Sequence, residues 1–280
     1  MNFKIIKSLL PPILLKFITN NLGYYNLAPW EYVREGFDYP INSQGWNLEQ
    51  IAELQFQKWP EYNKRISSTG GFGINHESEI ALGNDPFFHN LLISFAYVIT
   101  LSANNKKNVN FLDWGGGIGH YGLLANEILK PLDLHLNYYC YDFEVFGKFG
   151  QKLNLGYNFF SNTDQCLNVE FDLIMASSSI WYEKNWKDGV DHLCKYQTKY
   201  LYITRMIFIA KEQSYVAIQR PKAMGYKTEY LFWIINKYEF IDYLQSKDFK
   251  LLREFEFGET LPIFKAPEQG TVSGFLFIKH

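Results

Sequence analysis

An acidic residue followed by alternating glycines is the pattern in this chain with the clearest chemical meaning. Asp113 comes directly after the apolar run at residues 109–112, and a second apolar run with helical character covers residues 121–129. The glycines between them are Gly115, Gly117 and Gly119. Glycine accepts positive φ angles and lets a ligand approach the bare backbone, and the first turn of a helix offers unpaired N–H groups. The pattern indicates a nucleotide-type cofactor held at the end of a strand.

Two classes of cofactor use such a turn, and Asp113 discriminates between them. Residues 117–122 also match the GxGxxG pattern of dinucleotide sites, which is a weak signal by itself. A carboxylate two residues before the first glycine would lie close to a pyrophosphate, and like charges about 4 Å apart in a partly buried cleft repel by several kcal/mol. S-adenosylmethionine has no phosphate, and its sulfonium and ammonium groups attract a carboxylate. The acid therefore favours S-adenosylmethionine, and a dinucleotide-dependent oxidoreductase remains the alternative.

The elements that must position this turn alternate along the second part of the chain. Strand-like segments are separated by helical patterns, and they cover residues 109–112, 134–141, 171–176 and 200–204. Such alternation predicts βαβ units and a parallel sheet, which is an α/β fold of the Rossmann-like kind. The polar stretch at 103–108 marks where this part begins. We therefore expect an α/β domain over residues 109–280.

The two ends of this arrangement carry further signals. Residues 230–244 have helical spacing, and residues 250–257 and 272–279 are predicted to form a final antiparallel pair. Before the α/β domain we expect an N-terminal helical and lid extension over residues 1–108. The extension is rich in aromatic residues and turns and includes a glycine-rich loop near residue 70, which suits a lid that closes over the strand ends.

Residues 112–119, in the form hydrophobic-Asp-x-Gly-x-Gly-x-Gly, resemble the first motif of class I S-adenosylmethionine-dependent methyltransferases. The resemblance covers roughly residues 109–280 and implies a seven-stranded, mostly parallel sheet with a final antiparallel strand. It implies that Asp113 binds the methionine ammonium and that Asp142, 23 residues after Gly119, binds the ribose hydroxyls. Asp164, or a neighbour after the third strand, would reach the adenine amine. The glycines and Ser177 complete the implied cofactor site.

A narrower resemblance points to a class of acceptor. The Asp-x-Gly-Gly core, residues 177–182, Arg205 and the apolar N-terminus ahead of Trp30 are similar to a family of methyltransferases encoded among genes for O-antigen and capsule biosynthesis. An aspartate often precedes the arginine in that family, whereas Thr204 stands here. The resemblance implies methylation of a hydroxyl on a sugar or sugar nucleotide for surface polysaccharide. Nitrogen methylation of an amino sugar or a phosphoramidate-type group is the alternative.

Three residues are candidates for catalysis next to such a cofactor. His120 opens the helix after the glycines and is a candidate general base, although a surface or capping histidine is the simpler reading. Tyr182 follows the fourth strand, where it would orient a substrate hydroxyl or only contribute to packing. Arg205 ends the fifth strand and would bind a carboxylate or phosphate with its planar fork, unless it forms a salt bridge to Glu183 or Asp188. Without an unambiguous base, a catalytically silent, cofactor-binding homologue also remains open.

Composition limits the other classes of function. The net charge of −2 gives no support for binding a nucleic acid backbone, so we expect a small-molecule acceptor. The three cysteines are too few and too scattered for a disulfide framework or a zinc site, which fits a cytoplasmic protein. The histidine and acids at residues 76–79 lack a second cluster, so no metal is predicted. A basic amphipathic helix at residues 1–20 would lie on the inner face of a membrane or pack against the protein, and the sequence leaves the oligomeric state open.

Overall fold

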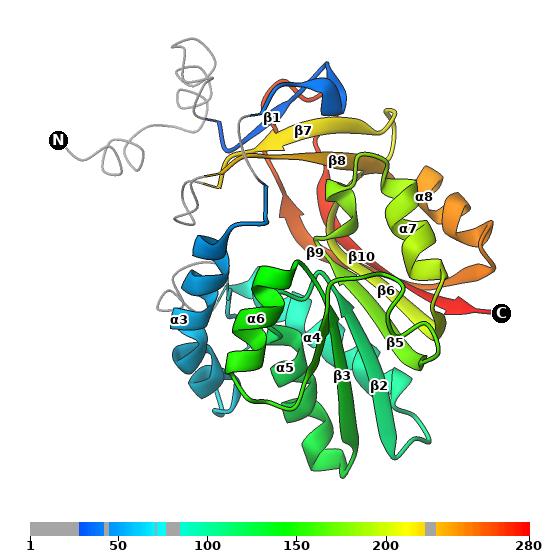
Figure 1. Ribbon diagram of the computed structural model, residues 1–280. Coiled ribbons are helices and arrows are strands. Elements are labelled where there is room, and N and C mark those ends of the chain that lie inside the picture. The colour runs from blue at the N-terminus through cyan, green and yellow to red at the C-terminus, as the bar shows by residue number, and fades with distance from the viewer. Residues whose placement is uncertain (1–27, 42–44, 71, 77–84, 222–227) are drawn as a thin grey trace.

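A large mixed sheet forms the centre of the protein (Figure 1). The computed structural model describes residues 28–41, 45–70, 72–76, 85–221 and 228–280. The strands are β1 (Trp30–Tyr32), β2 (Asn108–Trp114), β3 (His135–Tyr141), β4 (Asn158–Phe160), β5 (Glu170–Ser177), β6 (Gln197–Ile209), β7 (Tyr215–Gln219), β8 (Tyr230–Asn236), β9 (Phe249–Thr260) and β10 (Thr271–Lys279). The α-helices are α3 (Glu49–Ile66), α4 (Pro86–Ser102), α5 (His120–Leu129), α6 (Glu144–Lys152), α7 (Trp186–Cys194) and α8 (Lys237–Gln245), and three short 3-10 helices are η2 (Gly36–Asp38), η4 (Lys130–Leu132) and η5 (Ile180–Tyr182).

The main body of the sheet has the predicted Rossmann-like arrangement. Strands β4, β3, β2, β5 and β6 lie side by side and parallel, in that order. Strand β10 pairs antiparallel with β6, and β9 pairs antiparallel with β10. Each parallel neighbour is reached through a crossover, because two parallel strands cannot be joined by a tight turn. These seven strands, with β10 antiparallel and last in the chain, confirm the predicted Rossmann-like arrangement, and β1, β7 and β8 extend the sheet to ten strands.

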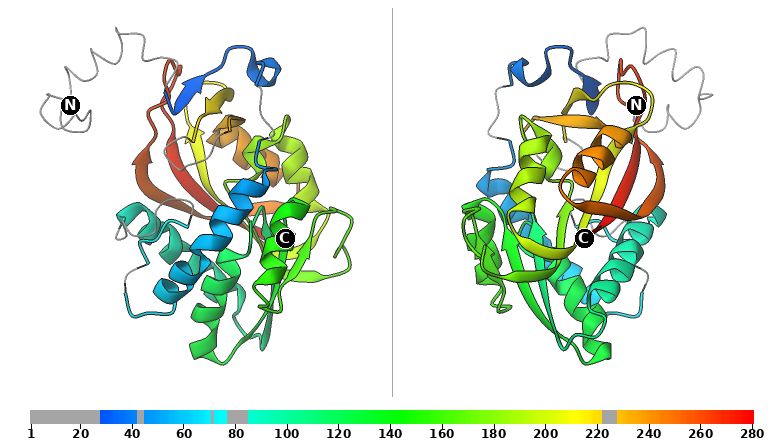
Figure 2. Two further views of the ribbon diagram at one scale, coloured as in Figure 1. Left: turned by 60° about the vertical axis from the view of Figure 1, so that its left-hand side comes forward. Right: turned by 90° about the vertical axis from the view of Figure 1, so that its right-hand side faces the viewer.

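Alternation along the strands divides the apolar side chains between the two faces of this sheet. Phe111 packs in a cluster with residues of α3, α4 and α5, whereas its neighbour Leu112 packs in a second cluster with residues of α7 and α8. Phe111 and Leu112 are both fully buried, as expected for parallel strands covered by helices on both sides. The views in Figure 2 show these helices in separate layers on either side of the strands.

The extension before β2 divides between two places in the fold. Helices α3 and α4 belong to the core, since Trp59 of α3 and Phe95 of α4 are buried in the same cluster as Phe111. Strand β1 instead pairs with β7, almost 190 residues later in the chain, with Trp30 opposite Gln219. The proposed boundary at residue 108 stays a prediction. The predicted helix at residues 1–20 lies outside the described residues.

Strands β1, β7 and β8 form a smaller antiparallel sheet above the carboxyl ends of the parallel strands (Figure 1). It joins the main sheet where Phe208 and Ile209 of β6 pair with β8. The prediction of one helix over residues 230–244 is wrong in its first half, which is β8. Asn236 ends the strand, and its side chain caps α8 by accepting hydrogen bonds from the N–H groups of Tyr238 and Glu239. A buried apolar run such as β8 has no periodicity that separates strand from helix.

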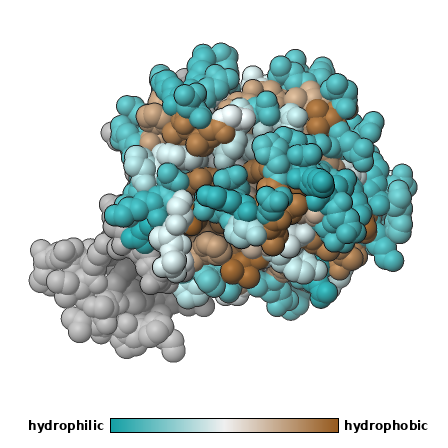
Figure 3. Space-filling model, turned by 90° about the horizontal axis from the view of Figure 1, so that it is seen from below, coloured by the Kyte–Doolittle hydropathy of each residue, from teal (hydrophilic) through white to brown (hydrophobic). Residues whose placement is uncertain are grey.

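Hydrophobic and hydrophilic residues are interspersed on the underside of the molecule (Figure 3). Among the described residues, seven large apolar side chains are exposed, including Ile93 and Tyr97 of α4 and Leu252 of β9. None of the described helices combines the length and apolar character needed to cross a membrane.

Candidate active site

A cavity of about 1170 Å³ opens at the carboxyl ends of the parallel strands, below the β1–β7–β8 sheet. One side of it comes from the segments that follow β2, β3, β4 and β5. We call this side the glycine wall, and its defining residues are Gly115, Gly117, Asp142 and Ser177. The other side comes from η5, β7, β8 and the segment before α3. We call it the aromatic wall, and its defining residues are Trp46, Tyr182, Gln219 and Tyr230.

The backbone of the glycine wall needs glycine at its turns. Gly115, Gly117 and Gly119 have φ angles of 77°, 60° and 102°, a region that side chains rarely adopt. A Cβ on Gly115 would lie 2.5 Å from Cβ of Ser179, and one on Gly117 would lie 2.9 Å from Oε1 of Gln55. Gly115 and Gly117 line the cavity, whereas Gly119 caps α5 outside the lining. The turn thus presents bare backbone to a ligand.

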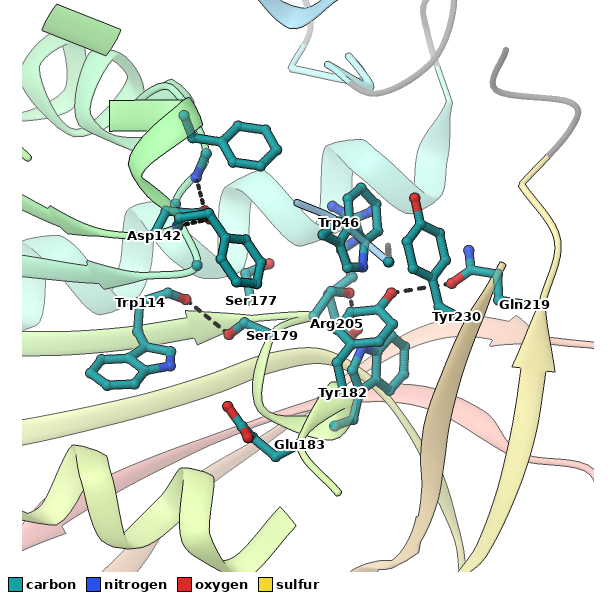
Figure 4. Close-up of a pocket in the computed structure, with 18 of the residues that line it drawn as sticks. Trp46, Trp114, Asp142, Ser177, Ser179, Tyr182, Glu183, Arg205, Gln219 and Tyr230 are labelled. Atoms are coloured by element: carbon teal, nitrogen blue, oxygen red, sulfur yellow. Dashed lines mark hydrogen bonds between the residues drawn. The ribbon is translucent and has the colours of Figure 1, made fainter. Parts of the chain in front are cut away.

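Asp142 places a carboxylate in the cavity beside this turn (Figure 4). Its Oδ2 accepts a hydrogen bond from the N–H of Gly117 at 2.7 Å, and its Oδ1 accepts one from the N–H of Phe143 at 2.7 Å. Burial raises the pKa of Asp142 to about 6, although these two N–H groups oppose the shift. Each carboxylate oxygen can accept a second hydrogen bond, so Asp142 can still receive ligand hydroxyls.

Asp113 lies behind the turn and does not line the cavity. Its side chain is buried, and its Oδ2 accepts a hydrogen bond from the Tyr138 hydroxyl at 2.7 Å. A Cβ on Gly116 would lie 2.5 Å from the same oxygen, so the carboxylate is pressed against the turn. Burial raises the pKa of Asp113 to about 7, with a smaller contribution from Asp142. Asp113 therefore supports the turn from behind, and its predicted contact with an ammonium group stays a prediction.

The segments after β4 and β5 complete the glycine wall. Ser177 lines the cavity, with its Oγ 3.4 Å from the hydroxyl of Tyr121. Ser179 donates a hydrogen bond to the carbonyl of Trp114 at 2.8 Å, which ties the β5 segment to the glycine turn (Figure 4). After β4, Ser161 lines the cavity, whereas Asp164 is exposed and lies outside the lining. Of the two candidates after β4, only Ser161 lines the cavity, and a contact of either residue with an adenine amine stays a prediction.

The structure brings a different histidine to the cavity from the one that the sequence suggested. His120 is only 2% exposed and does not line the cavity. Its ring stacks on that of His76, with centroids 4.3 Å apart, and His76 does line the cavity. Burial, followed by the charge of Arg205, lowers the pKa of His76 to about 3. The sequence contained His76 only as part of an unconvincing metal motif, and no local signal pairs it with His120.

Aromatic rings from distant segments build the aromatic wall. Trp46 stacks on Tyr230 with ring centroids 4.5 Å apart and planes within 10°, and Tyr182 meets Trp46 edge-on at 5.7 Å. The Tyr182 hydroxyl donates a hydrogen bond to Oε1 of Gln219 at 3.1 Å (Figure 4). Tyr182 was expected after the fourth strand, and it lines the cavity. Trp46 belongs to the aromatic segment that the sequence predicts to be a lid, where it would offer an apolar face to a sugar ring, whereas Gln219 could not be assigned to a site from the sequence.

Arg205 enters the cavity through an irregularity in β6. Ser273 of β10 pairs with Met206 and Phe275 pairs with Ile203, so two residues of β6 stand opposite one residue of β10. Arg205 is one of those two residues, and its φ is 56°. This is a β-bulge, which redirects a side chain out of the regular alternation. Arg205 lines the cavity, and its guanidinium carbon lies 5.8 Å from the centre of the Phe88 ring.

The charge of the lining is negative. Arg205 is the only lysine or arginine among the described lining residues, and the carboxylates are Asp85, Asp142, Glu144, Glu183, Glu229 and Glu259. Two of them are compensated outside the cavity, since Glu144 pairs with Lys148 and Glu229 pairs with Arg220. The remaining excess of carboxylates favours a cationic or neutral ligand over a polyanion.

Comparisons with known proteins find similarity in solved structures alone. No protein-family model matches the sequence, and no curated protein matches it. The chain is similar to an S-adenosylmethionine-dependent methyltransferase from Clostridium acetobutylicum, at 14% identity over 67% of this chain and 92% of that one, with a TM-score of 0.42. It is also similar to the 1,6-didemethyltoxoflavin N1-methyltransferase of Burkholderia thailandensis, at 9% identity over 86% and 93% of the two chains, with a TM-score of 0.45. An amino pentose methyltransferase from Micromonospora echinaspora shows 11% identity over 71% and 93%, with a TM-score of 0.45. Similarity at this level does not transfer an activity to this chain.

Proposed function

We propose that this protein is an S-adenosylmethionine-dependent methyltransferase that acts on a small polar acceptor. The observation that carries the proposal is the position of Asp142, whose carboxylate lies in the cavity and accepts a hydrogen bond from Gly117 of the glycine turn. A carboxylate at the end of the strand next to a glycine turn suits the ribose hydroxyls of a nucleoside. The negative lining around it suits a ligand with a sulfonium and an ammonium group.

The position of α5 and the hydrogen bond of the Gly117 N–H disfavour a dinucleotide. A dinucleotide site places the pyrophosphate at the N-terminus of the helix that follows the glycine turn. In this protein Gly119 and His120, at the start of α5, do not line the cavity. The N–H of Gly117, which a phosphate would need, already binds the Asp142 carboxylate. A pyrophosphate would therefore meet a negative charge where it needs a donor.

The residues of the chain would position donor and acceptor and exclude water. Methyl transfer is an in-line displacement with a good thioether leaving group, so alignment and dry surroundings supply most of the acceleration. Asp142 would bind the ribose, and the turn at Gly115 and Gly117 would lie against the methionine portion. Asp113 would favour the ammonium group by its charge from behind Gly116. Ser161, which lines the cavity after β4, would meet the adenine amine, and Ser177 would lie near the reacting methyl group.

The acceptor in this proposal is a hydroxyl of a sugar or sugar nucleotide destined for a surface polysaccharide. The resemblance of residues 177–182 and Arg205 to the polysaccharide-cluster family supports this class, as do the indole and phenol faces of the aromatic wall. Nitrogen methylation of an amino sugar uses the same alignment and needs no strong base. Incubation with labelled donor and pools of sugars, sugar acids, sugar phosphates and nucleotide sugars should give products heavier by one methyl group, whereas methylation confined to protein or nucleic acid would refute this acceptor class.

Calorimetric titration with S-adenosylhomocysteine tests the cofactor half of the proposal. The wild-type protein should bind it, and Asp142→Ala should weaken binding about tenfold or more, because charged hydrogen bonds to the ribose are lost. Asp242→Ala, an exposed position on α8 that does not line the cavity, is the matched control. Absence of binding to the wild type, or binding unaffected by Asp142→Ala, would sink the proposal. Enhanced NADH fluorescence on mixing would favour the oxidoreductase instead.

A catalytically silent protein with the same fold would bind S-adenosylhomocysteine but transfer no methyl group. A homocysteine-release assay with donor and an acceptor pool separates the two cases. Turnover supports the enzyme, and binding of S-adenosylhomocysteine without turnover on any acceptor pool supports the silent reading.

A further inference from the structure

The β-bulge at Arg205 is held in place from two strands. Thr204 makes the last pair with β5, opposite Ser177, and beyond the bulge β6 pairs with β8 instead. Arg205 therefore stands where β6 exchanges one neighbour for the other. A Cβ on Gly274, opposite the bulge, would lie 2.8 Å from Oγ1 of Thr204. The strand is fixed closely on both sides of the arginine.

Ser178, which hydrogen-bonds to the backbone of Arg205, also has an unusual backbone angle. Ser178 has a φ of 52° and Arg205 a φ of 56°, and non-glycine residues in this region are uncommon. The Ser178 side chain donates a hydrogen bond to the carbonyl of Arg205 at 2.6 Å, and its N–H donates to the carbonyl of Thr204 at 3.0 Å. Two strained residues that hold each other in a ligand cavity are a feature of functional sites.

The surroundings of the Arg205 side chain limit the charge of what it can bind. Burial and Asp85 raise the pKa of Glu259, and the positive charge of Arg205 opposes this rise. Arg205 supplies the only full positive charge among the described lining residues, since burial keeps His76 neutral. One guanidinium flanked by carboxylates can bind one anionic group, a carboxylate or a phosphate monoester, whereas the two linked phosphates of a nucleoside diphosphate would extend past Arg205 and lie beside those carboxylates.

The aromatic wall provides a surface for a ring next to this charge. Trp46 and Tyr182 line the cavity, and Gln219 joins them through the Tyr182 hydroxyl. Indole and phenol rings offer apolar faces, and an amide both donates and accepts hydrogen bonds. Such a surface suits a small ring that carries hydroxyl groups.

We propose that the acceptor is a small hydroxylated ring with a single oxyanion, a carboxylate or a phosphate monoester, which Arg205 binds while the ring lies against the aromatic wall. The inference rests on the proposed function and narrows its acceptor class, because it excludes acceptors linked to a nucleoside diphosphate. A planar guanidinium binds either oxyanion with two parallel hydrogen bonds. The fixed backbone at Arg205 would then orient the ring toward Ser177 and the methyl donor.

Four sugars of graded charge test the inference by ligand-observed NMR in saturating S-adenosylhomocysteine. The probes are glucose, glucuronate, glucose 6-phosphate and UDP-glucuronate. Glucuronate or glucose 6-phosphate should bind about tenfold more tightly than glucose, and the tighter of the two identifies the oxyanion. UDP-glucuronate should bind no better than glucuronate. Equal binding of glucose, glucuronate and glucose 6-phosphate, strongest binding of UDP-glucuronate, or failure of every probe to bind would overturn the inference.

Variants at Arg205 separate binding from a structural role. Arg205→Gly removes the guanidinium and relieves the positive φ, so the thermal midpoint should not fall, while binding of the tighter of glucuronate and glucose 6-phosphate weakens about tenfold or more. Arg205→Lys should be intermediate, since lysine lacks the planar fork. Arg253→Gln, an exposed arginine on β9, should change neither quantity.

A lower thermal midpoint of Arg205→Gly with unchanged binding of glucuronate and glucose 6-phosphate would assign Arg205 a purely structural role and overturn the inference. S-adenosylhomocysteine binding distinguishes this failure from failure of the proposed function. If the wild type binds S-adenosylhomocysteine and substitution of Arg205 does not change the binding of the sugar probes, only the acceptor inference is wrong. If the wild type does not bind it, the proposed function fails first.

Discussion

The two walls of the cavity differ in how the chain builds them. The glycine wall comes mainly from consecutive strand ends, with Gly115 and Asp142 only 27 residues apart, and it presents backbone groups. The aromatic wall combines Trp46, Tyr182 and Tyr230, which come from segments far apart in the chain, and it presents side chains. A ligand site made of backbone groups tolerates few substitutions, because they alter the turn itself. A ligand site made of side chains can change its ligand preference by substitution with little effect on the fold. In the proposed function this separates a fixed donor site from an adaptable acceptor site.

The largest effect should follow from adding one methyl group to the glycine wall. Gly115→Ala combines a φ of 77° with a Cβ 2.5 Å from Cβ of Ser179. We expect a loss of about 2 to 4 kcal/mol in the free energy of unfolding and loss of S-adenosylhomocysteine binding. Chemical denaturation and calorimetry measure the two effects.

Gly258→Ala is the control for Gly115→Ala, since its φ is 75° and nothing lies within 4 Å of the added Cβ. Gly258→Ala introduces the backbone strain alone, so its free energy of unfolding should fall by about 1 kcal/mol. Its binding of S-adenosylhomocysteine should be unchanged. Equal losses in the two variants would mean that the glycine wall is no more tightly packed than the exposed position of Gly258 in β9, and the contrast between the walls would fail.

A pH-dependent effect on stability should appear behind the glycine wall. Burial raises the pKa of Asp113 from 3.8 to about 7 in the folded state, so the folded protein holds this proton more tightly than the unfolded chain. The resulting stability is fully present below about pH 3.8 and is lost as the pH rises through about 7. Asp113→Asn does not titrate and can still accept from Tyr138. Its free energy of unfolding, relative to wild type, should therefore increase by about 2 to 4 kcal/mol between pH 4 and pH 8.

Denaturation curves of Asp113→Asn at several pH values measure this difference. Asp242→Asn, at an exposed position on α8, is the control for the loss of a carboxylate and should track the wild type. A difference between Asp113→Asn and wild type that stays constant with pH would show that the carboxylate is charged in the folded protein throughout this range.

The smallest effect should come from the aromatic wall. Tyr182→Phe removes the hydrogen bond to Gln219 and keeps the ring contacts with Trp46. The free energy of unfolding should fall by about 1 kcal/mol, and the affinity for S-adenosylhomocysteine should stay within about twofold, because Tyr182 belongs to the acceptor side. Calorimetry on this variant therefore sharpens the contrast. A large loss of S-adenosylhomocysteine affinity would show that the two walls do not act separately.

Several elements were readable from local sequence for a common reason. The alternation of β2, the glycines after it and the acid at the end of β3 form a pattern within a few dozen residues, and the final antiparallel pair β9 and β10 carries clear strand signals. Steric rules for glycine and the periodicity of strands act locally, so they leave a trace in sequence. The exception is β8, whose apolar residues are buried on both sides and show no period.

The sequence by itself determined the Rossmann-like sheet and the glycine turn with Asp142 beside it, because φ angles and side-chain alternation are properties of neighbouring residues. Only the tertiary structure decided that Asp113 lies behind the turn and that His76, rather than His120, reaches the cavity. It also decided that Arg205 points into the cavity, since a bulge depends on the register of β10 against β6. These features arise from contacts between residues far apart in the chain, and such contacts exist only after the chain has folded.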